Sequence, residues 1–344
     1  MGYLEPGDPC GGLHQWRTTT SRMTAPQPQA LFANPLTARL QPSRRILIAG
    51  AGGGFDVYAG LPLFLALRAQ GKDVFLANLS FTYLSATTSQ QLAPALWRVT
   101  HTSTGEPRYF PEGLLARWLH SRGLPDEVFA FEKVGVRPLR AAYQLLVERL
   151  HVDTVMLVDG GTDILMRGDE SGLGTPAEDM VSLAAVRHLN VEHKTVSCLG
   201  FGIDAFHGVC HAHFLENVSA LEQRGGTLGV HSLHLQDPAV AGFRDAVEHA
   251  HHHMPDRQSI VNGSILSALE GHFGNHHRTP RTAGSTLFIN PLMTHYWHFD
   301  LAAVAARSLY LDALEHTESI FDVQAHIEAF RRAATLRERV SIPV

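Results

Sequence analysis

The stretch RRILIAGAGGGFDVYAGLPLFLALRA, residues 44–69, decides the fold class. Residues 44–50 (RRILIAG) have the pattern of a short buried strand, with an apolar run after two arginines, and a glycine-rich turn follows them. The apolar segment 55–69 has helical length and ends just before Gly71. A buried strand that leads directly into a helix is typical of a parallel sheet covered by helices.

The same alternation continues along the chain. Further strands are predicted at 73–79, 154–160, 195–202, 227–233 and 286–292. Helices are predicted at 111–123, 137–151, 176–190, 213–224, 238–252, 259–273, 299–314 and 318–339. The strands are apolar throughout, as strands buried on both faces are. The sequence predicts an α/β protein with a Rossmann-like, mostly parallel, doubly wound sheet and helices on both faces.

The domain organisation follows from a change in composition near residue 44. Residues 1–43 contain scattered Pro, Thr, Gln and Gly without an apolar period, which predicts a flexible N-terminal arm. Met23 is an alternative candidate for the true start site. Residues 44–344 are predicted to form a single α/β domain, with room for a small C-terminal lobe.

Composition limits the classes of function. The 344 residues are 44% hydrophobic and 18% charged, which is typical of a globular protein. The sequence has no apolar run long enough for a spanning helix, and a net charge of −5 disfavours nucleic acid as a partner. Cys10, Cys198 and Cys210 are too sparse for a disulfide framework. We expect a cytoplasmic protein that binds a small molecule, neither a membrane nor nucleic acid, and that is compatible with a homo-oligomer.

Glycine and aspartate follow three of the predicted strands. Ligands of α/β proteins bind at the carboxyl ends of the strands, so we expect these three loops to converge on one functional site. The candidate catalytic residues are Asp159, Asp163, Asp204 and His207. The candidate ligand-binding residues are Gly52, Gly53, Gly54, Asp56, Gly160, Gly161, Thr162, Glu170, Gly202, Thr294 and Trp297. Carboxylates that meet in this way should raise one another's pKa.

The first glycine turn resembles a phosphate-binding turn but matches neither of the usual patterns. The third position of G-x-G-x-x-G falls on Phe55, and no G-K-[ST] follows. Asp56 would also repel a phosphate placed at the start of this helix, and it serves equally well as a helix cap.

A histidine-rich segment offers an alternative site. Asp204, His207 and His211 have helical spacing and could bind a divalent metal, although H-E-x-x-H is absent. The alternative is that the histidines of 207–213 are polar residues on a helix face. The histidines at 251–253 and 276–277 lie in polar stretches and are expected to be solvated.

Four motifs carry a resemblance to a known family. They are GAGGGFDVYAGLPLFLAL (50–67), FEKVGVRPLRAAYQLL (131–146), VDGGTDILMRGDESGLGTPAEDMVSLAAV (158–186) and GFGID (200–204). Together they resemble the DUF1152 family of archaeal and bacterial proteins, over about residues 44–310. The family name denotes unknown function, so the resemblance implies an α/β fold and a shared glycine/aspartate site but no reaction.

Three hypotheses about function remain open. The first is an enzyme, a hydrolase or transferase, that acts on a small polar metabolite such as a ribose- or nucleotide-like ligand. In it, Asp159 or Asp163 is the base, and Glu132 or His207 is a weaker candidate for the acid. The second is a metal-dependent hydrolase or other metalloenzyme with Asp and His ligands. The third is a non-catalytic protein that senses a nucleotide through the same glycine loops.

Overall fold

The computed structural model describes residue 2 and residues 34–342. Met23, the alternative candidate for the start site, lies outside the described residues, as do Cys10 and most of the predicted arm. The described residues from Asn34 onward belong to one compact unit, which contains every element discussed below.

Nine strands of the described chain form one sheet, in the order β3-β4-β5-β2-β1-β6-β7-β9-β8. Their bounds are β1 Arg45–Gly50, β2 Asp73–Leu79, β3 Gln90–Ala93, β4 Leu96–Val99, β5 Val128–Phe131, β6 Thr154–Gly160, β7 His193–Leu199, β8 Thr227–Ser232 and β9 His295–Asp300. The central strands β5-β2-β1-β6-β7 are parallel. At the edges, β4 is antiparallel to β5 and to β3, and β9 is antiparallel to β7 and β8. The sheet is therefore mixed, and the prediction of a mostly parallel sheet holds only for its centre.

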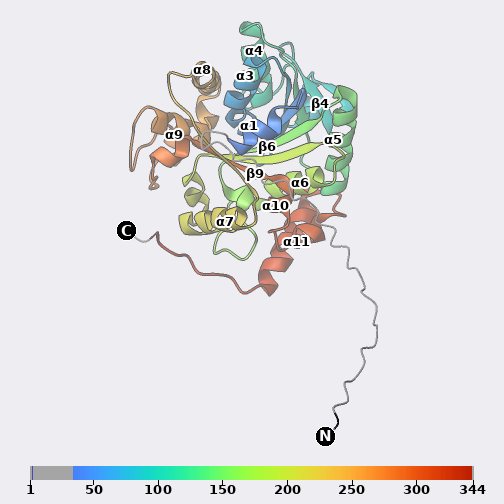
Figure 1. Cartoon of the computed structure of the whole chain (residues 1–344). Helices are drawn as coiled ribbons and strands as arrows, with labels where there is room; N and C mark the ends of the chain where they lie inside the picture. Colours follow the sequence, from blue (N-terminus) through green and yellow to red (C-terminus); the bar gives the residue numbers. More distant parts are fainter. Residues whose placement is uncertain (1, 3–33, 343–344) are drawn as a thin grey trace. The chain divides into compact units, whose positions relative to one another are not determined.

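Helices pack on both faces of the sheet. They are α1 Pro35–Leu40, α2 Asp56–Ala59, α3 Leu61–Ala69, α4 Pro111–Ser121, α5 Val136–Leu150, α6 Pro176–Arg187, α7 His211–Gln223, α8 Pro238–His253, α9 Ile260–Leu269, α10 Leu301–Ala305 and α11 Ile320–Ala333. Successive residues of a strand point to opposite faces. Ile46 and Ile48 of β1 join the core under α3, α4 and α8, whereas Leu47 and Ala49 join the core under α5, α6 and α11. Figure 1 shows α3, α4 and α8 on one side of the sheet and α6, α10 and α11 on the other.

The last strand is not where the sequence predicts it. Residues 286–292 were expected to be a strand, but they form irregular chain and the start of a 3-10 helix, Pro291–Thr294. The side chain of Asn290 accepts a hydrogen bond from the backbone N–H of Leu292, and Pro291 cannot donate to a ladder. The strand is instead β9, whose aromatic residues suit a strand between two neighbours.

The strands β3, β4 and β5 were not predicted. β3 and β4 form a hairpin whose turn holds Ala95 at φ 59, so they pair in antiparallel fashion without a crossover helix. Each of the three is only four residues long, which gives too few positions for a periodic pattern.

The boundary of the folded part also differs from the prediction. Within the predicted arm 1–43, residues Pro35–Leu40 form α1, which Asn34 caps by accepting a hydrogen bond from Leu36 N–H at 2.9 Å. Leu36 and Leu40 are buried in the same core as Ile46. The short helix escaped the sequence analysis because two apolar residues are too few to define a period. Within the described residues, no helix is long and apolar enough to cross a membrane.

Candidate functional site

The carboxyl ends of β1 and β6 meet at a reversal of strand order. From β1 the chain adds β2 and then β5 on one side, and it later adds β6 and β7 on the other. At such a switch point the loops after the two central strands diverge, and α/β proteins bind their ligands there. Asp56 follows β1 and begins α2, while Asp159 lies at the end of β6.

Three aspartates converge at this point. One carboxylate oxygen from each of Asp56, Asp159 and Asp179 lies within 4.8 Å of the other two. Asp179 is in the first turn of α6, which packs back toward the end of β6. The three side chains are almost wholly buried, with exposures of 8%, 2% and 1%. Three elements from distant parts of the chain thus hold three carboxylates around one small volume.

Two further aspartates flank this trio. A methyl group placed on Gly161 would lie 2.9 Å from a carboxylate oxygen of Asp204 and 3.0 Å from Oδ1 of Asp159, so these two carboxylates face the same glycine. Asp163 lies against Gly174 on the adjoining loop. The predicted convergence of Asp56, Asp159, Asp163 and Asp204 is therefore present, with Asp179 added to it.

Four of the five carboxylates have hydrogen-bond donors. Gly52 N–H donates to Asp56 at 2.6 Å, Ile164 N–H to Asp159 at 3.1 Å, Thr175 N–H to Asp163 at 2.7 Å, and Thr162 N–H to Asp204 at 2.6 Å. Asp179 differs, because both of its oxygens are buried and neither has a hydrogen-bond partner. The nearby ammonium group of Lys133 forms an ion pair with the neighbouring residue Glu178 instead, at 2.7 Å. A buried carboxylate without a partner is costly unless a ligand compensates for it.

Burial raises the pKa of all five carboxyl groups, and repulsion from a neighbouring aspartate adds to the shift for four of them. Burial raises the pKa of Asp56 to about 8, and the negative charge of Asp163 adds to the effect. Burial, followed by the charge of Asp163, holds the pKa of Asp159, Asp179 and Asp204 well above the usual range. Burial also raises the pKa of Asp163 itself. This agrees with the expectation that carboxylates meeting at the strand ends titrate abnormally.

The glycines make room for these carboxylates. A methyl group on Gly52 would lie 2.8 Å from Asp179 Oδ1 and 2.9 Å from Asp56 Oδ2, and one on Gly160 would lie 2.8 Å from Asp56 Oδ1. Gly53 and Gly54 have φ values of +90° and +64° and face Phe81 and Tyr109 instead. In the first glycine turn, the Gly52 amide thus donates to the carboxylate of Asp56. This carboxylate occupies the position that a phosphate would need.

Several predicted ligand-binding residues serve the local structure elsewhere. Glu170 accepts hydrogen bonds from Gly168 N–H and from Asn217, which ties its loop to α7. Trp297 packs its ring on Phe214. Thr294 donates its hydroxyl to the carbonyl of Pro291 and lines a separate cavity of about 260 Å³.

The predicted acids Glu132 and His207 and the glycine loop at 200–204 make other contacts. Glu132 accepts a hydrogen bond from Trp97 Nε1 at 2.8 Å. Gly202, at φ +92°, packs against the His211 ring. His207 is exposed, whereas the carboxylates of the centre are buried.

The predicted metal ligands Asp204, His207 and His211 do not form a site together. Among the residues that the structure describes, they are absent from the groups whose ligand atoms approach within 4.8 Å. The helical spacing assumed for them fails because residues 203–207 form a 3-10 helix that ends at Gly208, and α7 begins only at His211. The trio that does converge is Asp56, Asp159 and Asp179.

Sequence reasoning missed Asp179. The segment P-A-E-D at 176–179 reads as an ordinary helix start, because acidic residues in the first turn favour the helix dipole. The order of the elements in the chain was the available signal. Because α6 is the helix that follows β6, its first turn must lie at the same edge of the sheet as Asp159. That placement would have added Asp179 to the strand-end aspartates.

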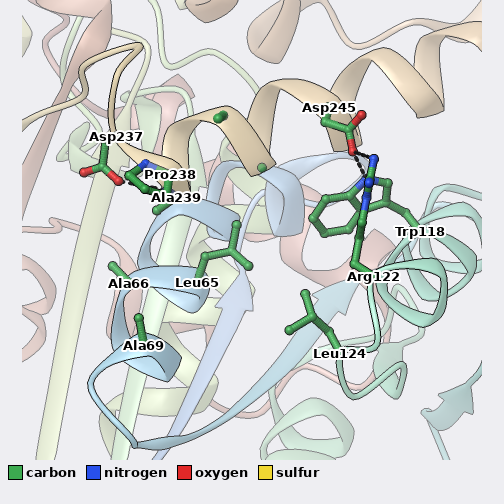
Figure 2. Close-up of a pocket in the computed structure, with 12 residues that line it drawn as sticks. Leu65, Ala66, Ala69, Trp118, Arg122, Leu124, Asp237, Pro238, Ala239 and Asp245 are labelled. Atoms are coloured by element: carbon green, nitrogen blue, oxygen red, sulfur yellow. Dashed lines mark hydrogen bonds and ion pairs between the residues drawn. The ribbon is translucent and has the colours of Figure 1, made fainter.

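Another cavity lies away from the carboxylates. It has a volume of about 620 Å³, lies between α3, α4 and α8, and is lined in part by Leu65, Ala66 and Ala69. Figure 2 shows that its one charged cluster is internally satisfied, since Trp118 and Arg122 both donate to Asp245. This cavity has no unpaired polar group comparable with Asp179.

The fold and the site together define an α/β protein with a buried carboxylate centre at the switch point of its sheet. The chain belongs to the family described as "Protein of unknown function (DUF1152)", whose model matches residues 88–336. The match includes Asp159, Asp163, Asp179 and Asp204, and it begins after β1 and Asp56. No curated protein and no solved structure matches the chain.

Proposed function

We propose that this protein is a divalent-cation-dependent enzyme, a hydrolase or transferase that acts on a small polar metabolite of the nucleotide or ribose class. One observation carries the proposal: Asp56, Asp159 and Asp179 bring oxygens within 4.8 Å of one another, and both oxygens of Asp179 are buried without a partner. A cation bound among them would supply the missing partner and offset three buried negative charges.

The ligand atoms favour a hard cation. All three are carboxylate oxygens, which suit Mg²⁺, Mn²⁺ or Ca²⁺ better than a metal that prefers nitrogen or sulfur. The proposal therefore keeps the metal-dependent hypothesis and replaces its histidine ligands with Asp56, Asp159 and Asp179.

The flanking aspartates supply the acid–base chemistry. A bound cation polarises a phosphoryl or carbonyl oxygen and makes a coordinated water more acidic. Asp204 uses Oδ2 to accept from Thr162 and faces Gly161 and Asp159 with the rest of its carboxylate, so it is placed to accept a proton from a water held there. Asp163, with His207 near it, is the second candidate for this role.

The position of the centre supports the substrate class. In the parallel block β5-β2-β1-β6-β7 the strand order reverses between β1 and β6. Nucleotides bind at such a switch point in doubly wound folds, and this likeness supports the proposal. A nucleotide or sugar phosphate offers both a phosphate for the cation and hydroxyls for carboxylates.

The test begins with the cation. Protein freed of metal by a chelator is titrated calorimetrically with Mn²⁺ at pH 8, and we expect about one equivalent to bind with a dissociation constant below about 0.1 mM. Asp179→Asn should abolish that binding. No Mn²⁺, Mg²⁺ or Ca²⁺ binding tighter than about 1 mM in the wild type would refute the cation site.

The reaction is tested separately. Nucleosides, nucleotides and sugar phosphates are incubated with the Mn²⁺-loaded protein, and products are followed by mass spectrometry. Turnover that requires Mn²⁺ and is lost in Asp204→Asn supports the enzyme. Tight binding of a nucleotide without turnover would instead support a non-catalytic sensor.

A further inference from the structure

A second group of metal-binding side chains lies at the opposite edge of the sheet. Ligand atoms of His101, His120 and Asp126 all lie within 4.8 Å of one another. Val99 at the end of β4 pairs with Val128 at the start of β5, so His101 and Asp126 stand opposite each other just beyond this pair. His120 comes from the last turn of α4. Three elements again meet, here at the amino ends of the parallel strands.

The contacts bring the three side chains together. Imidazole nitrogens bind a metal in the plane of the ring, so the largely exposed His120 must turn out of its stack on His101 for both rings to reach one ion. The His101 ring nitrogen Nδ1 contacts Asp126 Oδ2, and His120 Nδ1 lies 4.0 Å from the same oxygen. The two imidazole rings are stacked, with centroids 3.6 Å apart and planes 13° apart. The backbone N–H of His101 also donates to Asp126 Oδ2 at 3.0 Å, which fixes the carboxylate in place.

The exposure of the group leaves it open to ions from solution. The side chains of His101, His120 and Asp126 are 38%, 58% and 23% exposed.

We propose that His101, His120 and Asp126 form a transition-metal site, separate from the aspartate centre, that takes Zn²⁺ or a similar ion. Two imidazoles and one carboxylate form a common set of three protein ligands for Zn²⁺, with the remaining position open to solvent. Hard cations such as Mg²⁺ favour all-oxygen sites, so the two groups of side chains select different metals. A metal here joins β4, α4 and the loop before β5.

The test uses untagged protein that has been freed of metal, and the probes are Zn²⁺ and Co²⁺ alone. We expect His120→Gln to lower the affinity for Zn²⁺ at least about tenfold and to remove the visible Co²⁺ band of a histidine-bound ion. His120 has no hydrogen bond that the fold needs, since its ring only stacks on His101 and is mostly exposed. His101→Gln should have the same effect.

A matched control comes from another histidine pair. His272 and His276 stack at 3.7 Å and 7°, but their nearest carboxylate, Glu270, is held by Arg278. His272→Gln should change the Zn²⁺ affinity less than about twofold. Equal losses in His120→Gln and His272→Gln, or no loss in His120→Gln, would overturn the proposal. Neither result bears on Mn²⁺ binding at Asp179, so the two sites are tested independently.

Discussion

At the scale of the residue, replacing Asp179 is the most direct test of the proposed cation site. Asp179→Asn keeps the size of the side chain and removes a buried ionisable group that has no partner. We expect Mn²⁺ affinity to fall about 100-fold or more. We also expect the metal-free protein to gain about 1–3 kcal/mol of unfolding free energy, because folding no longer raises the pKa of a carboxyl group at this position. Calorimetry and urea unfolding measure the two effects. Asp245→Asn, which breaks a surface ion pair with Arg122, is the control and should leave Mn²⁺ binding intact.

A substitution at Gly52 tests whether the cation needs the space between the carboxylates, without changing their charge. Its φ is not in the left-handed region, so alanine fits the backbone, but the added methyl group would lie 2.8 Å from Asp179 Oδ1. We expect Gly52→Ala to weaken Mn²⁺ binding at least about tenfold while the protein stays folded. Gly263→Ala in α9, where the nearest atom is 3.4 Å away, is the matched control. Equal Mn²⁺ affinities in the two variants would show that the cation does not lie near Gly52.

The sequence predicts most of the site at this scale, for a definite reason. Asp56, Asp159, Asp163 and Asp204 each follow an apolar strand run, and the geometry of a parallel sheet is enough to bring such residues together. Asp179 lies in a helix, and its place depends on how α6 packs against the sheet, which periodicity does not reveal. Trp297 and Thr294 were assigned to a pocket because they follow a segment wrongly predicted as a strand.

At the scale of the element, β9 carries a buried histidine that makes the sheet sensitive to acid. His298 is 0% exposed and shares a hydrogen bond of 2.8 Å with Ser197 Oγ on β7. Burial, and then the charge of His231, lowers its pKa from 6.5 to about 3. The unfolded chain therefore binds a proton below pH 6.5 that the native state does not, so this histidine makes stability fall as the pH falls from about 6.5 to about 3.

His298→Phe isolates this contribution. The variant loses a constant amount of stability because Ser197 loses its partner, but it no longer titrates at this position. We expect the difference in unfolding free energy between wild type and variant to shrink by about 3 kcal/mol between pH 6.5 and 4, as measured by urea unfolding. A difference that stays constant over this range would mean that His298 is protonated normally in the folded protein.

At the scale of the whole molecule, the cost of the aspartate centre should appear in the stability of the metal-free protein. Burial raises the pKa of Asp56 from 3.8 to about 8, and it also holds the pKa of Asp159, Asp179 and Asp204 well above 3.8. The native state thus keeps protons that the unfolded chain releases at much lower pH. Stability that depends on such groups is complete below pH 3.8 and is lost as the pH rises through the native pKa.

The range from about pH 7 to 8.5 contains the Asp56 pKa of about 8 and lies above the ordinary pKa of a free histidine, about 6.5, so it suits a test of the aspartates. We expect metal-free protein to lose about 1–3 kcal/mol of unfolding free energy across this range. Saturating Mn²⁺ should remove the loss and add about 2.7 kcal/mol at 100 times its dissociation constant, because the cation takes the place of the protons between the carboxylates. Urea unfolding at pH 7 and at pH 8.5, with and without Mn²⁺, measures the unfolding free energy under these four conditions. Stability that rises with pH in the metal-free protein would contradict the assignment, since it would mean that the aspartates are ionised and compensated by a partner within the chain.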